Sequence, residues 1–291
     1  MAKKVRARML AEDIKRDEGL EIPEDVVLYD NISYGPYGSA NLLSVSKPSG
    51  VSGKLPCIVN FHGGGFFYGS KETYQFYCAS LAQRGFAVIS FNYRLSPEVK
   101  FPAPAKDSTR MLEWMTDNAD EYGIDTENVF FVGDSAGAHL AVQISAMMTN
   151  PEYARLFKFR VPGGFKLHAI ATNCGMYDVL RLDIRLLKLT MLAYAPLKYI
   201  FRSKKLDVMR YVNKGFPPCF IASASHDMLL SYAAPWEKLL RQQGVETVCK
   251  IYGDKDDESA GHVFHVNIRL DIAGKCNDDE CGFFRKHIVS A

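Results

Sequence analysis

A serine flanked by small residues is the feature of this sequence with the clearest chemical potential. Ser135 lies in Gly133-Asp134-Ser135-Ala136-Gly137, which matches the pattern G-x-S-x-G. A serine at so sharp a turn has a strained backbone, and larger side chains two positions away would clash with the neighbouring strand and helix. The turn exposes the hydroxyl at a helix N-terminus, where partial positive charge favours a developing anion. We therefore predict that Ser135 is a nucleophile, although the motif alone is short enough to occur by chance.

A glycine-rich loop is the second chemical feature. The run His62-Gly63-Gly64-Gly65-Phe66 directly follows an apolar segment that ends at Phe61. Glycines leave backbone N–H groups uncovered, so these groups can closely approach a substrate oxygen. Acyl transfer needs such donors because its tetrahedral intermediate carries a new negative oxygen, and losing one donor costs about 3 kcal/mol. A phosphate loop is rejected because Ser70-Lys71 stands where Lys-Ser/Thr is required. A purely structural glycine turn remains the alternative.

The elements around these two loops alternate between strand and helix patterns. The expected strands are residues 26–33, 40–45, 55–61, 86–93, 129–132, 165–174, 218–224 and 247–252, and the expected helices are 3–16, 73–83, 105–118, 136–148 and 233–243. The first two strands read as an antiparallel pair at a sheet edge. The alternation that follows predicts a mostly parallel, doubly wound sheet in one α/β domain that spans residues 1–291.

One segment interrupts the alternation. Residues Met176 to Phe216, about forty positions, carry mixed apolar and basic helical patterns and are too many for an ordinary loop. We expect inserted helices above the carboxyl edge of the sheet, where open α/β folds bind ligands. Together with residues 1–22 this segment, 176–216, is the predicted cap. A helix pair that merely extends the core is the alternative.

Composition excludes several classes of protein. Hydrophobic residues make up 47% and charged residues 23%, which is ordinary for a soluble globular protein with a sizeable core. The net charge of +2 gives no reason to expect a nucleic acid or an anionic membrane as partner. Neither a signal peptide nor a membrane span is expected. The seven cysteines are an odd number that favours reduced thiols and a cytoplasmic location.

No cofactor and no metal are expected. Cys276 and Cys281 lie close together in what reads as a polar tail, but no second Cys/His pair accompanies them. A structural zinc site needs four such ligands, so this pair alone does not predict one.

Three motifs in this order resemble one protein family. His62 to Phe66 reads HGGGF, Tyr93 to Pro104 reads YRLSPEVKFPAP, and Gly133 to Gly137 reads GDSAG. They resemble the hormone-sensitive-lipase-like carboxylesterases of the α/β-hydrolase superfamily, over about Leu55 to His262. The resemblance implies the α/β-hydrolase fold, a mostly parallel eight-stranded sheet flanked by helices, with a helical cap, and the hydrolysis of carboxylic esters.

The chain order of the family's triad is Ser, then Asp or Glu, then His. Asp227 follows a late expected strand in a D-x-L setting, and His262 follows the last one in a G-H-x-F setting. The resemblance implies that His262 accepts the Ser135 proton while Asp227 holds the imidazole ring. Asp178 competes with Asp227 for the role of the acid, and its position in the chain disfavours it. His265 competes with His262 for the role of the base, and the glycine that precedes His262 favours His262.

Supporting roles also follow from the resemblance. It implies that His62 supports the glycine loop and that Asp134 fixes the turn. Aromatic bulk near the loop, at Phe66, Phe67 and Tyr68, is expected to narrow a substrate pocket. The expected oxyanion donors are the backbone N–H groups of Gly63, Gly64 and Ala136.

The predicted function is that of a serine carboxylesterase that hydrolyses short-chain, acetyl-type esters through an acyl-enzyme. Its partner is a small-molecule ester, and the family resemblance admits a homodimer. Two alternatives stay open at this point. One is a non-catalytic small-molecule-binding protein on the same fold, and the other is a serine amidase or peptidase, because a triad alone does not set specificity.

Overall fold

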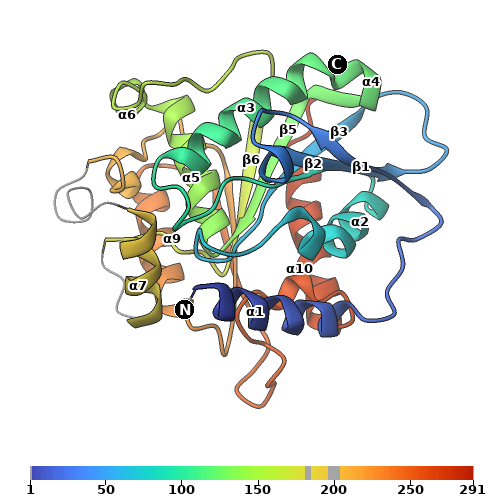
Figure 1. The fold of residues 1–291 in the computed structure, drawn as a ribbon. Helices are drawn as coiled ribbons and strands as arrows, with labels where there is room; N and C mark the ends of the chain where they lie inside the picture. The colour runs from blue at the N-terminus through green and yellow to red at the C-terminus, as the bar shows by residue number, and fades with distance from the viewer. Residues whose placement is uncertain (1, 181–184, 196–203, 291) are drawn as a thin grey trace.

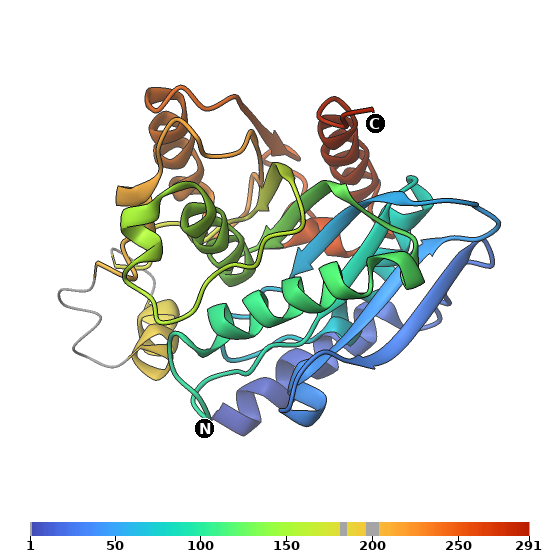
Figure 2. The same cartoon turned by 90° about the horizontal axis from the view of Figure 1, so that it is seen from above.

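The structure is a computed structural model that describes residues 2–180, 185–195 and 204–290. Its centre is one sheet of eight strands, with helices on both faces (Figures 1 and 2). The strands are β1 Val26–Ser33, β2 Leu42–Pro48, β3 Leu55–Phe61, β4 Ala87–Phe91, β5 Ile124–Asp134, β6 Leu167–Asn173, β7 Cys219–Ala224 and β8 Thr247–Tyr252. The main helices are α1 Ala2–Asp17, α2 Gln75–Gln83, α3 Ala103–Asp117, α5 Ala136–Thr149, α7 Arg185–Tyr194, α9 Leu230–Gln242 and α10 Asp271–Arg285. Short helical segments are α4 Ala119–Tyr122, α6 Pro151–Ala154, η1 Gly38–Asn41, η2 Lys71–Tyr74, η3 Val208–Tyr211 and η4 Phe264–Val266.

The sheet order is β1-β2-β4-β3-β5-β6-β7-β8. β1 and β2 are antiparallel to their neighbours, and every pairing from β4 to β8 is parallel. This arrangement confirms the predicted mostly parallel, eight-stranded sheet. Because parallel strands end at one edge, the loops after β3, β5, β7 and β8 meet there.

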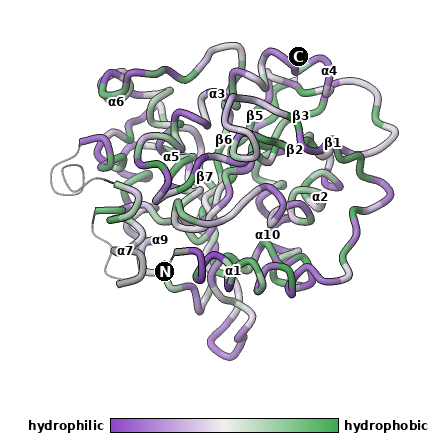
Figure 3. Tube along the Cα trace, viewed as in Figure 1, coloured by the Kyte–Doolittle hydropathy of each residue, from purple (hydrophilic) through white to green (hydrophobic). Residues whose placement is uncertain are grey.

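Burial on both faces explains the continuous apolar strands. Along β5, Val129 and Phe131 face a core covered by α3, α5 and α9, whereas Phe130 and Val132 face a core covered by α2 and α10. A strand packed on both sides has no solvent face, so its sequence does not alternate between apolar and polar residues. Figure 3 shows hydrophobic residues along the central strands and hydrophilic ones along much of α1.

The C-terminal segment differs from the prediction. Residues 271–285 form α10, with Cys276 and Cys281 as buried free thiols on its inner face. The prediction of a polar tail was wrong because the apolar residues of this segment share the inner side of a helix, while most of its charged residues, Glu280 excepted, lie on the outer side. α10 covers one face of the sheet.

The predicted insertion is described in part. Its described residues include α7 and η3, while residues 181–184 and 196–203 of the predicted cap lie outside the described residues. α1 and α7 lie at the same end of the molecule (Figure 1). Within the described ranges, no helix combines the length and the apolar character needed to cross a bilayer.

Candidate active site

Ser135 occupies the turn between β5 and α5, with φ 49° and ψ −115°. Positive φ is strained for a serine, so the surroundings must hold this conformation. A Cβ atom on Gly137 would lie 1.9 Å from the carbonyl oxygen of Phe61, and one on Gly133 would lie 2.6 Å from the carbonyl oxygen of Gly137. The backbone N–H of Ser135 donates to the carbonyl oxygen of Asn173, at 3.1 Å. Close backbone approach therefore explains both glycines of the motif.

Asp227 and His262 form a hydrogen-bonded pair. His262 Nδ1 lies 2.6 Å from Asp227 Oδ1. The carboxylate also accepts hydrogen bonds from the hydroxyl of Ser223, at 2.6 Å, and the backbone N–H of Leu229, at 2.9 Å. Burial alone would raise the pKa of Asp227, but these bonds, that of His262 foremost, hold it below the ordinary value. The Asp227 carboxylate is thus ionised at neutral pH and fixes the imidazole.

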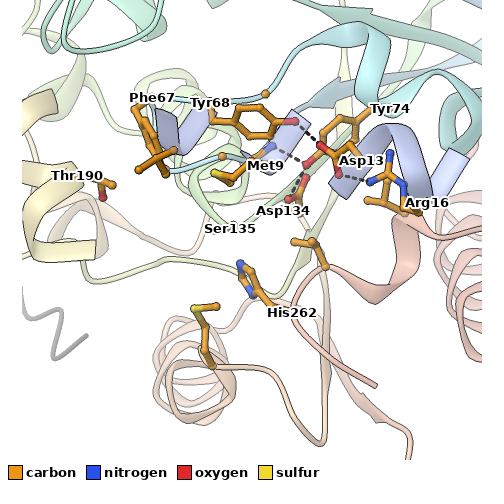
Figure 4. A pocket seen from close by; sticks show the side chains of 18 residues that line it. Met9, Asp13, Arg16, Phe67, Tyr68, Tyr74, Asp134, Ser135, Thr190 and His262 are labelled. Carbon is orange, nitrogen blue, oxygen red and sulfur yellow. Dashed lines mark hydrogen bonds and ion pairs between the residues drawn. The ribbon is translucent and has the colours of Figure 1, made fainter. Parts of the chain in front are cut away.

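Ser135 and His262 line one cavity, whereas the competing residues do not (Figure 4). His265 is fully buried, and burial lowers its pKa to about 3. Asp178 accepts a hydrogen bond from the backbone N–H of Leu180, at 3.3 Å, as turn aspartates do. The geometry brings together the three residues that the motifs single out.

The oxyanion loop departs from the prediction at one position. The backbone N–H of Gly63 donates to the Tyr74 hydroxyl, at 3.0 Å, and that hydroxyl donates to Asp134 Oδ2, at 2.9 Å. Gly63 N–H is therefore engaged inside the protein, and the geometry does not support the prediction that it binds the oxyanion. Gly64 and Gly65 line the cavity, and no hydrogen bond between described residues uses their N–H groups or that of Ala136.

His62 and Asp134 brace the two loops from below. The His62 ring is fully buried and stacks on Tyr93 with centroids 4.1 Å apart, while the Tyr93 hydroxyl donates to the His62 carbonyl oxygen, at 2.7 Å. Burial lowers the pKa of His62 to about 4, so this ring is neutral at pH 7. Burial raises the pKa of Asp134 to about 7, against the hydrogen bond from Tyr74.

The cavity has a volume of about 180 Å³. Tyr68 lines it, whereas Phe66 does not. The prediction for Phe66 was wrong because its ring is fully buried and stacks on Tyr194, with centroids 3.9 Å apart. The next residue, Phe67, takes the place at the cavity wall. Aromatic bulk therefore lies at the cavity wall at two of the three predicted positions, 67 and 68.

Sequence reasoning missed the contribution of α1. Four of its residues line the cavity: Val5, Met9, Asp13 and Arg16. Their spacing places them on one face of a helix, which is the signal that could have found them. Thr190 of α7, which lies next to Gly65 of the glycine loop, and Met228, beside Asp227, also line the cavity.

One group of side chains has the composition of a metal site. Among the described residues, Cys174, Asp227 and His262 offer ligand atoms that all lie within 4.8 Å of one another. Asp227 and His262 are already bonded to each other, and Cys174 Sγ accepts the backbone N–H of Val263, at 3.4 Å. Burial raises the pKa of the Cys174 thiol well above its ordinary value, which disfavours the thiolate that a metal needs. The arrangement fits a catalytic pair better than a metal centre.

Comparisons with known proteins agree with this geometry. A family model for the alpha/beta hydrolase fold matches residues 58–266. The chain is 28% identical over 253 residues to a versiconal hemiacetal acetate esterase of Dothistroma septosporum, covering 79% of this chain and 71% of that protein. It is 30% identical over 236 residues to the carboxylesterase NlhH of Mycobacterium tuberculosis, covering 78% and 71%.

A solved structure of similar architecture is that of esterase B from Lactobacillus rhamnosis. The two chains superpose with a TM-score of 0.88 at 23% identity, over 98% of this chain and 93% of the other. At this identity the likeness demonstrates the shared fold.

Proposed function

Because the chain belongs to the alpha/beta hydrolase fold family, we propose that Ser135, Asp227 and His262 are the catalytic triad with which it hydrolyses short-chain carboxylic esters. Ester hydrolysis itself follows from its relatives, which are esterases matched over most of this chain. The observation that carries the residue assignment is the Asp227–His262 bond of 2.6 Å, which directs the imidazole into the cavity that contains Ser135.

The reaction uses these groups in two halves. His262 Nε2 takes the hydroxyl proton as Ser135 attacks the ester carbon, and then protonates the departing alcohol. Water, deprotonated by His262, next attacks the acyl-enzyme and releases the acid. Asp227 keeps Nδ1 protonated throughout and stabilises the imidazolium.

The oxyanion is proposed to bind the N–H groups of Gly64, Gly65 and Ala136. Gly64 and Gly65 face the cavity, and Ala136 N–H lies at the start of α5, where the helix dipole adds partial positive charge. Gly63 is proposed to act indirectly, because its N–H ties the loop to Tyr74. Donors held in place before the reaction stabilise the transition state without reorganisation.

A short acyl chain fits the size of the site. The cavity of about 180 Å³ is smaller than the pockets of about 300–1,000 Å³ that hold drug-sized ligands. Its walls are mostly apolar, with Phe67 and Thr190 on one side and Met9 of α1 on another. We propose that α1 and α7 are the cap that limits the length of the acyl chain.

A labelling experiment tests the nucleophile. After treatment with a fluorophosphonate, mass spectrometry is expected to find the adduct on Ser135 and none in Ser135→Ala. Ser145→Ala is the matched control, because this serine is buried too and, among the described residues, its hydroxyl bonds only the carbonyl oxygen of Ala141. Label on another residue, or equal hydrolysis of p-nitrophenyl acetate by wild type and Ser135→Ala, removes Ser135 from the role.

A series of p-nitrophenyl esters tests the acyl preference. We expect the highest kcat/KM between acetate and hexanoate and a steep fall beyond, since longer chains exceed the cavity. A maximum at palmitate contradicts the proposal. Matched ester and anilide substrates separate esterase from amidase activity, with the ester expected to be hydrolysed faster.

We also propose a cytoplasmic location and a homodimer. All seven cysteines are free thiols, which suits a reducing compartment. β8 is an edge strand of the sheet and exposes Ile251, so a second copy can pair beside it. Light scattering after size exclusion tests the assembly, and a monomer at all concentrations rejects it.

A further inference from the structure

A buried carboxyl group lies beneath the nucleophile turn, on the side opposite the cavity. Glu280 of α10 has no solvent exposure. Its Oε2 accepts a hydrogen bond from Asn173 Nδ2, at 2.6 Å, and its Oε1 accepts one from the Tyr77 hydroxyl, at 3.0 Å. Among the described residues, no lysine or arginine forms an ion pair with Glu280. Burying a carboxyl group costs free energy, and no ion pair offsets that cost here. The presence of Glu280 at this position therefore needs a reason other than charge pairing.

Asn173 links Glu280 to the nucleophile. Asn173 is the last residue of β6 and lies opposite Asp134 in the parallel register of β5 and β6. Its carbonyl oxygen accepts the backbone N–H of Ser135, at 3.1 Å. The side chain of this one asparagine is thus held by α10 while its backbone holds Ser135.

A second carboxyl braces the other side of the same turn. Asp134 accepts the hydroxyl of Tyr74, which in turn accepts the N–H of Gly63 in the oxyanion loop. Tyr74 ends η2 and Tyr77 lies in the first turn of α2, and their rings meet edge to face at 6.4 Å. The two tyrosines therefore connect the carboxyl groups of β5 and α10 to the nucleophile turn and the oxyanion loop.

We propose that Glu280 is a positioning residue that acts through Asn173 on the backbone of Ser135. This inference rests on the proposed role of Ser135 as nucleophile. The positive φ of Ser135 persists only where its neighbours over-determine it, and the Asn173 carbonyl is one such neighbour. If Asn173 loses its side-chain anchor, the nucleophile shifts relative to the oxyanion donors, and misplacement of about 1 Å can lower the rate about a hundredfold.

The main test compares two substitutions at the same position. Glu280→Leu removes both acceptors, whereas Glu280→Gln keeps an acceptor for Tyr77. Once the Asn173 amide turns over, the new N–H also donates to Asn173 Oδ1, which is buried without a hydrogen-bond partner among the described residues. With p-nitrophenyl acetate, and rates normalised to the sites that a fluorophosphonate titrates, Glu280→Leu is expected to lower kcat about tenfold or more at nearly unchanged KM. Glu280→Gln is expected to stay within about threefold of wild type.

The control is Cys281→Ala on the same helix. Cys281 follows Glu280 on α10, and its side chain is fully buried in the core that α10 covers. Among the described residues, its thiol makes no hydrogen bond to the nucleophile turn. Its loss is expected to lower Tm while leaving kcat per titrated site unchanged. A general loosening of α10 would instead lower kcat in Cys281→Ala and Glu280→Leu alike.

Asn173→Ala cuts the link from its other end. It keeps the backbone carbonyl that Ser135 contacts, and the same fall in kcat is expected, which also decides the matter should Glu280→Leu fail to fold. Wild-type kcat in either folded variant overturns the positioning role, as does an equal loss in Glu280→Gln. Failure of the catalytic assignment itself gives a different result, because wild type would then carry no label on Ser135.

Discussion

The cavity is enclosed by two regions that are held in different ways. Around Ser135 the contacts are buried and short: backbone packing at Gly137, the Asn173 carbonyl, and side chains with almost no solvent exposure. α1, on the other side, is attached by charged side chains that are partly buried. Arg6 Nε donates to the carbonyl oxygen of Phe67, at 2.6 Å, and Arg16 Nη2 donates to that of Thr73, at 2.6 Å.

The outer side of α1 is mostly solvated. Leu10 and Ile14 are 45% and 62% exposed, so few apolar contacts fasten the helix beyond those that line the cavity. This difference indicates that the position of the reacting groups and the access of substrate to the cavity depend on separate sets of contacts. Displacing α1 breaks surface hydrogen bonds but leaves the core intact, whereas moving Ser135 requires the core to rearrange.

The most damaging change is expected in the core. Gly137→Ala places a Cβ atom 1.9 Å from the Phe61 carbonyl oxygen, and the nearest atoms are all backbone of Phe61 and His62, which cannot rotate away as a side chain could. We expect a loss of stability on the order of 4 kcal/mol or more together with loss of activity. Denaturant unfolding and ester hydrolysis measure the two effects.

Gly282→Ala on α10 is the matched control. A Cβ atom there meets nothing within 4 Å, so the substitution is expected to stabilise the protein by up to about 1 kcal/mol. Equal effects of the two substitutions would contradict the claim that packing at the nucleophile turn is exceptional.

The second largest effect is expected on catalysis alone. Asp227→Asn keeps the shape of the side chain but favours the wrong tautomer of His262, so kcat is expected to fall about 10⁴-fold. Thermal unfolding should change little by comparison. Asp178→Asn, the carboxylate that competes in sequence, is expected to keep kcat near that of wild type. A large loss in Asp178→Asn instead would reassign the acid.

The core side of the site is the part that the sequence predicts well. Strands β1, β3 and β8 begin and end where their apolar patterns do, and the triad motifs lead to residues that meet at one edge of the sheet. These features depend on local rules, namely strand burial, tight turns and the order of parallel strands. Neighbouring residues carry all of that information.

Errors arose where contacts between distant segments decide. Gly63 was expected to bind the oxyanion, but the hydroxyl of Tyr74 takes its N–H. Phe66 was expected at the cavity, but the ring of Tyr194 buries it. α10 was read as a polar tail because acidic residues lie between its two buried cysteines. In each case the partner lies on another element, so no local pattern reveals it.

The third prediction compares how the two regions respond to pH. Burial raises the pKa of both Asp134 and Glu280 to about 7, above the ordinary 3.8 and 4.5. Between the ordinary pKa and about pH 7, the folded protein keeps protons on Asp134 and Glu280 that the unfolded chain releases. The contribution of these two groups to stability therefore falls as pH rises to about 7. Glu280→Gln is expected to flatten that fall, by roughly 1.4 kcal/mol per pH unit for one group.

Glu98, which anchors α1, is expected to behave oppositely. The hydrogen bond from Arg6 lowers the pKa of Glu98. The Glu98 carboxylate therefore contributes to the stability of the fold at pH values above the ordinary pKa of a glutamate, and this contribution is lost as pH falls. Glu98→Gln should therefore differ from wild type at neutral pH and converge with it in acid. Denaturant unfolding at a series of pH values measures both slopes, and slopes of the same sign would remove the contrast between the regions.

The smallest effect is expected at the attachment of α1. Arg6→Ala removes the bonds to Phe67 and to the carbonyl oxygen of Ser96, together with an ion pair to Glu98 whose partners are 25% and 62% exposed. We expect kcat/KM for p-nitrophenyl acetate to fall by about five- to tenfold, since hydrogen bonds of charged groups contribute about 1.5–3 kcal/mol before solvent screening. The relative rate on longer esters should rise as the cavity opens.

Arg8→Ala provides the matched control on the same helix. Within the described part of the chain, Arg8 pairs only with Glu12 at the surface, with side chains 82% and 61% exposed. The salt dependence of KM distinguishes the two variants further. Salt screens the Arg6–Glu98 ion pair in wild type and in Arg8→Ala, whereas this pair is absent from Arg6→Ala. We therefore expect KM to rise with ionic strength in wild type and in Arg8→Ala, and to stay constant in Arg6→Ala. If all three respond alike, the surface contacts of α1 do not control access, and the cavity is gated by the core that surrounds Ser135.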